Sequence, residues 1–245
     1  MKKYIEYIEN CERIINRINT NEAQKIERAA EYFKNSVLNG RPIYLFGTGH
    51  SHMLAEELFY RAGGLVDVQP ILETSLMLHE SASKSTEIER LEGYAEIIFN
   101  HYGIKSGDVM VIISNSGRNG VVVDMALLCK ERGVTVIALT NTEHAKAGAS
   151  RHKSGKRLFE IADLVLDNCG CNGDASVAVD GVEGKICPTS TVAGALILNA
   201  AVAECVDLCV KEGFVPVHFA SSNVDGGDEI NNAIIAAKRG EVRHL

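Results

Sequence analysis

The amino-acid sequence predicts a doubly wound α/β fold, in which helices cover both faces of a parallel sheet. Five short apolar runs alternate with longer segments of helical periodicity, and this alternation is typical of βαβ units. The runs contain few polar residues, as expected of parallel strands that are buried on both faces. A chain of 245 residues is long enough for one such domain with a short extension.

Residues 1–38 are predicted to form an N-terminal helical extension. Isoleucines recur in this segment at three- and four-residue spacing, with charged residues between them. Asn39 and Gly40 are typical of a helix end. Residues 39–245 contain no linker rich in Pro, Gly or Ser and no repeat, so we expect them to form a single domain.

Glycines end the helices that separate the predicted strands. A helix is expected from about residue 51 to residue 62, where Gly63 and Gly64 follow, and another leads to Arg132, before Gly133. The strands themselves are expected at residues 43–46, 65–68, 109–113, 134–139 and 164–166.

The last part of the chain departs from this alternation. Residues 175–186 alternate in polarity around Asp180 and Gly181, which predicts a small hairpin. A long apolar helix is expected after Pro188, at residues 191–210, and a short helix ends the chain.

Charge and apolar pattern argue against several classes of partner. With 25 Lys and Arg against 32 Asp and Glu, the net charge is −7, which argues against binding to nucleic acid or a membrane surface. The apolar helix contains Asn199, Glu204 and Asp207, which a membrane span rarely tolerates. The first residues carry glutamates where a signal peptide would have its apolar core. We therefore expect a soluble cytoplasmic protein.

The seven cysteines are scattered and odd in number, which favours reduced thiols over a disulfide framework. Cys169, Cys171 and Cys187 are the candidates for a zinc site, but they lack the paired C-x-x-C spacing of structural zinc sites. The sequence predicts neither a metal nor a cofactor.

Two loops that follow predicted strands are rich in glycine and hydroxyl groups. The first is GTGHSH, residues 47–52, and the second is SNSGRNG, residues 114–120. Backbone N–H groups, hydroxyls and a helix N-terminus on one loop suit a phosphate monoester, although hydroxyl-capped turns are common in any α/β protein. The predicted binding residues are Gly49, His50, Ser51, Ser114, Asn115, Ser116, Gly117 and Asn119.

These loops resemble those of the sugar isomerase (SIS) domain family over roughly residues 40–170. Ser114-x-Ser116-Gly117 resembles the phosphate-binding S-x-S-G of that family, whose members usually have Ser or Thr where Asn119 stands. GTGHSHMLAEELFYRAGG and the later SNVDGGDE are similar to a poorly characterised SIS subfamily. Its relatives are phosphoheptose isomerases, N-acetylmuramic acid 6-phosphate etherases and the isomerase half of glucosamine-6-phosphate synthase. The resemblance implies a flavodoxin-like fold and a homodimer or homotetramer with sites near subunit boundaries.

Aldose–ketose isomerisation needs a base that removes a proton α to a carbonyl. Glu57 is the candidate base, and its alternative is a surface ion pair with Arg61, four residues later. Aligned from the first loop, Glu57 falls on the histidine and Arg61 on the glutamate of the phosphoheptose isomerases. The catalytic pair and the metal site of those enzymes therefore do not carry over.

Ring opening needs a second acid or base, for which His79 and His218 are the candidates. His79 begins a polar stretch, HESASKSTEIER, that suits either a lid or a surface loop. After His218, Asn223 and Asp225 are candidates for binding sugar hydroxyls. The basic cluster at residues 151–157 is expected to be a solvated face, or else a loop that closes over a phosphate or a neighbouring subunit's site.

The sequence thus predicts an enzyme that isomerises a hexosamine- or heptose-type sugar phosphate. One alternative is a lyase, an etherase or dehydratase, that acts on an N-acetylated amino-sugar 6-phosphate. Another is a phosphosugar sensor without catalysis that acts on a protein partner. A DNA-binding sensor is disfavoured, because 38 residues before the first strand are too few for a helix-turn-helix and a linker.

Overall fold

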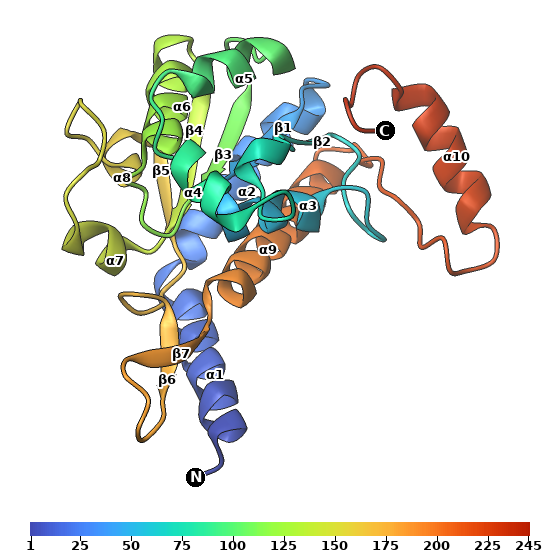
Figure 1. Ribbon diagram of the computed structural model, residues 1–245. Coiled ribbons are helices and arrows are strands. Elements are labelled where there is room, and N and C mark those ends of the chain that lie inside the picture. The colour runs from blue at the N-terminus through green and yellow to red at the C-terminus, as the bar shows by residue number, and fades with distance from the viewer.

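A computed structural model, which describes all 245 residues, shows a five-stranded parallel sheet in the order β2-β1-β3-β4-β5 (Figure 1). Every pair of neighbouring strands is parallel, which confirms the predicted doubly wound α/β class. The strand order reverses at β1 and β3, and ligands of such sheets bind at this switch point, beyond the carboxyl ends of the strands. The strands are β1 (Ile43–Gly47), β2 (Val68–Pro70), β3 (Val109–Ile113), β4 (Thr135–Thr140) and β5 (Leu164–Asp167).

Helices cover both faces of the sheet because successive strand residues point to opposite sides. Ile43 and Leu45 belong to a core of 27 buried residues beneath α2 (Ala23–Leu38), α3 (Met53–Leu58) and α9 (Ser190–Lys211). Tyr44 and Phe46 belong to a core of 19 buried residues on the other face. The helices of that face are α5 (Tyr94–Tyr102), α6 (Gly120–Glu131) and α8 (Leu158–Ile161).

The N-terminal segment is two helices, α1 (Lys3–Asn21) and α2, that meet at Glu22. Glu22 is only 3% exposed, and its carboxylate accepts hydrogen bonds from Lys25 and from the backbone N–H of Asp167 at the end of the sheet. The lower part of α1 lies beside the hairpin of β6 (Ala175–Ala178) and β7 (Lys185–Pro188) in Figure 1. Asn10 donates to the carbonyl of Ser176 at 3.0 Å, so the predicted hairpin is present and fixed to α1.

Two predicted elements were wrong in their bounds. The helix expected at residues 51–62 is a 3-10 turn, η1 (Gly49–His52), followed by α3, which ends at Leu58. It ends there because Phe59 is extended and Tyr60 has a positive φ of 47°. The strand expected at residues 65–68 is displaced to Val68–Pro70, since Leu65 pairs instead with His218 in an isolated antiparallel bridge.

Several short helices were not expected. The polar stretch after β2 contains η2 (Thr74–Leu76) and α4 (Ala82–Ile88), and α7 (Thr142–Ala147) follows β4 directly. These helices have 3, 7 and 6 residues, which is too short for a helical pattern of apolar residues to be recognised in the sequence.

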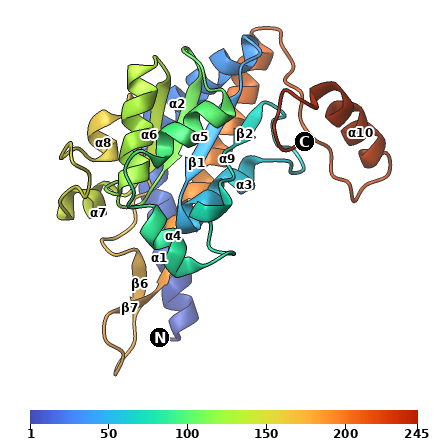
Figure 2. The ribbon, with the colours of Figure 1, turned by 45° about the horizontal axis from the view of Figure 1, so that its top comes forward.

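The last two helices of the chain differ in how they pack against the rest of the fold. α9 is long and apolar enough to cross a membrane by length and composition, but it packs on α2 and α3 as a helix of the larger core. α10 (Gly227–Lys238), in contrast, stands apart from the sheet in both views (Figures 1 and 2). The chain then returns toward β2, where the backbone N–H of Arg243 donates to Gln69 at 2.7 Å.

Candidate functional site

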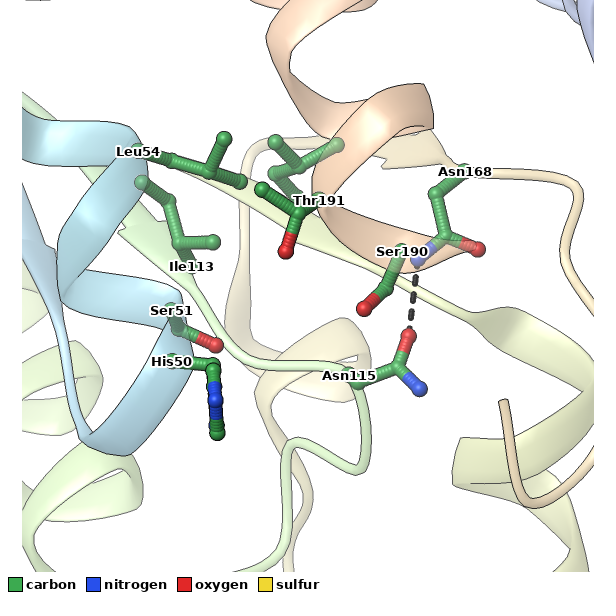
Figure 3. A pocket seen from close by; sticks show the side chains of 9 residues that line it. His50, Ser51, Leu54, Ile113, Asn115, Asn168, Ser190 and Thr191 are labelled. Atoms are coloured by element: carbon green, nitrogen blue, oxygen red, sulfur yellow. Dashed lines mark hydrogen bonds between the residues drawn. The ribbon is translucent and has the colours of Figure 1, made fainter. Parts of the chain in front are cut away.

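A small pocket lies at the switch point, beyond the carboxyl ends of β1 and β3 (Figure 3). Its cavity volume is about 30 Å³, which admits one anionic group or one end of a ligand rather than a whole sugar phosphate. The first loop, the second loop, the end of β5 and the start of α9 all contribute to it. Its lining residues are His50, Ser51, Leu54, Ile113, Asn115, Leu139, Asn168, Ser190 and Thr191.

The first loop turns tightly because Gly47 has no side chain. A Cβ at Gly47 would lie 2.6 Å from the backbone carbonyl carbon of Ser51, and Gly49 has a positive φ of 55°. The turn brings Ser51 opposite the first residues of α9, and the hydroxyl oxygens of Ser51, Ser190 and Thr191 point into the same space (Figure 3). The loop thus places the Ser51 side chain in the pocket. His50 also lines the pocket, but its side chain is exposed to solvent.

Hydrogen-bond donors without a partner gather in this pocket. The hydroxyls of Ser51 and Thr191 make no hydrogen bond, whereas Ser190 donates to Asp174 at 2.6 Å. Asp174 also accepts from the backbone N–H groups of Thr189 and Ser190 and so fixes the start of the 22-residue helix α9. The Asp174 carboxylate thus already caps the N-terminus of α9, and the donors left for an oxyanion in the pocket are the hydroxyls of Ser51 and Thr191.

A chain of three side-chain amides fixes the orientation of Asn115 at the edge of the pocket. The Oδ1 of Asn141 accepts from the backbone N–H of His144, so Nδ2 of Asn141 donates to Oδ1 of Asn168 at 2.8 Å. The Oδ1 of Asn168 also accepts from the backbone N–H of Gly170, and its Nδ2 donates to Oδ1 of Asn115 at 2.7 Å. Because two backbone donors fix these orientations, the Nδ2 of Asn115 is left free as a donor for a ligand.

The sequence interpretation missed Asn141 and Asn168. Both are almost fully buried, at 1% and 4% exposure, and each directly follows a strand, β4 or β5. An asparagine after each of three neighbouring strands was a signal available in the sequence, because the carboxyl ends of parallel strands meet at one edge.

The second loop does not present all the groups that were predicted to bind phosphate. Ser114 is 7% exposed, and its hydroxyl accepts from the backbone N–H of Gly117, whose φ is 58°. Ser114 and Gly117 therefore close the loop upon itself. Ser116 is half-buried with a free hydroxyl, but it lines a neighbouring cleft and not the switch-point pocket.

Asn119 is engaged at both ends of its amide, which corrects its predicted role as a free phosphate donor. Its Nδ2 donates to Oε1 of Glu89 at 2.7 Å, and its Oδ1 accepts from Nη1 of Arg151 at 3.1 Å. Glu89, which the sequence interpretation also missed, accepts from the Thr48 hydroxyl at 2.7 Å through its other oxygen. Glu89 and Asn119 thus join the two loops to each other.

Glu57 lies one turn after Leu54 on α3 and does not line the pocket. Its carboxylate forms the ion pair with Arg61 that the sequence allowed as the alternative, and it accepts from Nδ2 of Asn199 on α9 at 3.2 Å. Its side chain remains 32% exposed, so it faces solvent along the junction of α3 and α9.

The remaining predicted residues are not brought together within one chain. His79 is exposed in the turn between η2 and α4, after the carboxyl end of β2. His218 pairs with Leu65, before β2 begins, and therefore lies at the opposite edge of the sheet. Asn223 and Asp225 are exposed in the loop that leads to α10, away from the pocket. Within this chain, His218, Asn223 and Asp225 therefore lie apart from Ser51 and Asn115.

The cysteines do not form a cluster with other metal-binding side chains, and no group of three His, Cys, Asp or Glu is placed to hold a metal ion. Burial, with the nearby Asp167 carboxylate, raises the pKa of the Cys169 thiol to about 11. All seven cysteines are free thiols.

Comparison with known proteins identifies the family of this chain. The model of the SIS domain family matches residues 6–141, which span the two loops and the strands that carry them. The chain therefore belongs to the SIS domain family. Among curated relatives, a UPF0309 protein of Thermoanaerobacter pseudethanolicus is 42% identical over 98% of this chain and 99% of its own length. A UPF0309 protein of Halalkalibacterium halodurans is 44% identical over 94% of this chain and 92% of its own.

Solved structures of two phosphoheptose isomerases share the fold. Phosphoheptose isomerase GmhA of Neisseria gonorrhoeae superposes with a TM-score of 0.52 at 18% identity, over 84% of this chain and 95% of that one. A phosphoheptose isomerase of Francisella tularensis gives a TM-score of 0.52 at 17% identity, over 83% and 96%. The resemblance that the sequence suggested is thus confirmed for the family and the fold.

Proposed function

We propose that this protein binds a sugar phosphate of the hexosamine or heptose type at the switch-point pocket and catalyses its aldose–ketose isomerisation. One observation carries the proposal. The hydroxyls of Ser51 and Thr191 and the side chain of Asn115, whose Nδ2 has no partner in the chain, line one pocket where η1 and α9 begin. Membership of the SIS domain family supports phosphosugar binding in general, and these donors supply the chemistry that an oxyanion needs.

Glu57 is the proposed base. Arg61 and Asn199 hold its carboxylate on the side of α3 that also carries Leu54 into the pocket. The pocket takes one end of the ligand, so the reacting carbons lie outside it, over the exposed end of α3. His79 is the proposed acid for ring opening, because its turn follows β2 at the same edge of the sheet.

We propose in addition that the protein is a homodimer or homotetramer whose sites lie near subunit boundaries. Met53, Val192 and Leu196 on α3 and α9 are 42%, 45% and 37% exposed, and they form an apolar surface next to the pocket. Val224 and Ile230 on the segment of α10 are 58% and 52% exposed. A neighbouring subunit that buries these side chains brings its own copy of His218, Asn223 and Asp225 to this surface.

Product analysis tests the proposal. The purified protein is incubated with glucosamine 6-phosphate and, separately, with a heptose 7-phosphate, and the mixture is followed by NMR and mass spectrometry. With the heptose 7-phosphate the proposal predicts an aldose and a ketose of equal mass. With glucosamine 6-phosphate, proton removal from C2 gives a 2-imino sugar, which water hydrolyses to fructose 6-phosphate and ammonia. An unsaturated product formed with loss of water or of a C3 substituent would favour the lyase alternative. Binding without turnover of any sugar phosphate would favour a sensor.

A further inference from the structure

A second cleft opens at the carboxyl edge of the sheet, between the second loop and α7. Its volume is about 430 Å³, and it shares no lining residue with the switch-point pocket. The second loop separates the two, since Asn115 lines the pocket and its neighbour Ser116 lines the cleft. The residues of the cleft used below are Ser116, Arg118, His144, Gly148 and Arg151.

Positive charge gathers at this cleft without a counterion, although the protein as a whole has a net charge of −7. Arg118 and Arg151 line it and form no ion pair with any carboxylate. Burial first, and then the charges of Arg118 and Arg90, lower the pKa of Arg151, so both of these guanidinium groups lie close enough to Arg151 to repel it. Like charges held together destabilise the fold unless an anion joins them.

One carboxylate, Glu89, acts on Arg151 through its charge but forms no ion pair with it. Both of its oxygens accept hydrogen bonds from neutral groups, the Thr48 hydroxyl and the Asn119 amide. Arg151 donates to the Asn119 amide instead, a neutral acceptor. The guanidinium groups of Arg118 and Arg151 therefore retain most of their donors for a ligand.

The backbone holds these arginines in place. A Cβ at Gly148 would lie 2.5 Å from Nη1 of Arg118, so the glycine leaves the space that this guanidinium fills. The residue after Arg151 is His152, which is 6% exposed and bonded to Asp124 at 2.8 Å. The segment that carries Arg151 is thus fixed to α6 at His152, while Arg151, Lys153 and Lys156 are exposed, as expected of a solvated face.

Neutral donors complete the cleft. The Ser116 hydroxyl has no hydrogen-bond partner. The Nδ1 of His144 lies 2.6 Å from Oδ1 of Asn172 and 3.0 Å from the backbone nitrogen of Gly173, so this ring nitrogen is already engaged within the chain. Two guanidinium groups and a hydroxyl form a set of donors that binds phosphate or carboxylate oxygens.

We propose that this cleft is a second oxyanion-binding site, separate from the switch-point pocket, in which Arg118 and Arg151 bind a phosphate or carboxylate group. The group is either the second acidic group of a ligand whose first phosphate occupies the pocket or a separate anion. The inference goes beyond the proposed isomerase, because it holds whatever reaction occurs at the first pocket.

Calorimetric titration of the full chain with inorganic phosphate tests the site. The variants are Arg118→Gln with Arg151→Gln, Ser51→Ala for the first pocket, and Arg132→Gln as the control. Arg132 is an exposed arginine at the other end of α6. We expect the double arginine variant to weaken phosphate binding at this cleft about tenfold or more. Arg132→Gln should bind phosphate as the wild type does, and Ser51→Ala should affect only phosphate that binds at the switch-point pocket. Equal binding by the double variant and the wild type, or an equal loss in Arg132→Gln, overturns the proposal.

Two sugar phosphates then distinguish the sources of the anion. If one ligand spans both sites, fructose 1,6-bisphosphate binds more tightly than fructose 6-phosphate, and the double arginine variant removes that advantage. If the anion is separate, the two sugars bind alike and inorganic phosphate still binds in the presence of saturating fructose 6-phosphate. Failure of the first pocket is recognised independently, since Ser51→Ala would then leave fructose 6-phosphate binding unchanged.

Discussion

Asn168 donates a hydrogen bond through its Nδ2 to the Oδ1 of Asn115 at 2.7 Å and so fixes the orientation of the Asn115 amide. The two residues follow β5 and β3, strands that are not adjacent in the sheet. Asn141, after the intervening β4, completes the connection. The site is therefore oriented by the edge of the sheet and not by one loop alone.

Replacing Asn168 by Asp tests this orientation. A carboxylate at residue 168 has no N–H to donate to Asn115, and it places a negative charge beside the proposed anion site. We expect the affinity for a sugar phosphate to fall about tenfold or more, as measured by calorimetric titration. Asn100→Asp, the same change on the exposed face of α5, is the control and should bind as the wild type does. Wild-type affinity in Asn168→Asp would show that Asn115 does not act as a donor.

The junction of the two loops makes a prediction about stability. Glu89→Ala leaves the Thr48 hydroxyl and the Asn119 amide, both in residues only 7% exposed, without their acceptor. We expect the free energy of unfolding to fall by about 1–3 kcal/mol, measured by urea denaturation. Glu87→Ala, an exposed glutamate on α4, should change it by about 0.5 kcal/mol at most. Similar losses in both variants would argue against the junction.

The proposed base makes a prediction about catalysis. Glu57→Gln keeps the shape of the side chain but removes its capacity to accept a proton, so turnover should fall at least about a hundredfold while ligand binding is retained. The adjacent Glu56 is exposed and serves as the control, with Glu56→Gln expected to remain active. Both variants are compared by steady-state kinetics and by thermal shift with the same sugar phosphate. Full turnover in Glu57→Gln would assign the proton transfer to another group.

Buried thiols make stability depend on pH in the alkaline range. Burial raises the pKa of Cys129 to about 12 from a usual value of 9.0. Between these values the unfolded chain has lost the proton and the folded chain retains it, so stability that is present below pH 9 is lost as the pH rises. Cys129→Ala should reduce the slope of unfolding free energy against pH between 9.5 and 11 by about 1.4 kcal/mol per pH unit. An unchanged slope would show that Cys129 ionises in the folded state.

Much of the fold followed from the sequence because buried parallel strands are apolar along their whole length. β1, β3, β4 and β5 lie within one or two residues of their predicted positions. The second strand was misplaced because Leu65 and Val66 are as apolar and as buried as Val68, and a tertiary contact with the segment around His218 decides which of them joins the sheet.

The sequence predicts a pocket residue when the loop that carries it determines its position. It does not predict the hydrogen bonds that a loop residue makes with a residue far away in the chain. Ser51 and Asn115 lie in the pocket because their loops follow β1 and β3 directly. Asn119 looked equally suitable, but Glu89, thirty residues earlier in the chain, occupies its amide group. Contacts of this kind leave no periodic pattern in the sequence.

The measurement that tests the central claim most directly is the thermal shift of the wild type and Ser51→Ala with a panel of sugar phosphates and their unphosphorylated parents. A ligand at a hundredfold excess over its Kd stabilises the native state by about 2.7 kcal/mol. The switch-point pocket predicts a rise in Tm with at least one phosphorylated sugar, no rise with its parent, and a smaller rise in Ser51→Ala. No rise with any sugar phosphate, or rises of equal size in the wild type and Ser51→Ala, would contradict phosphate binding at this pocket.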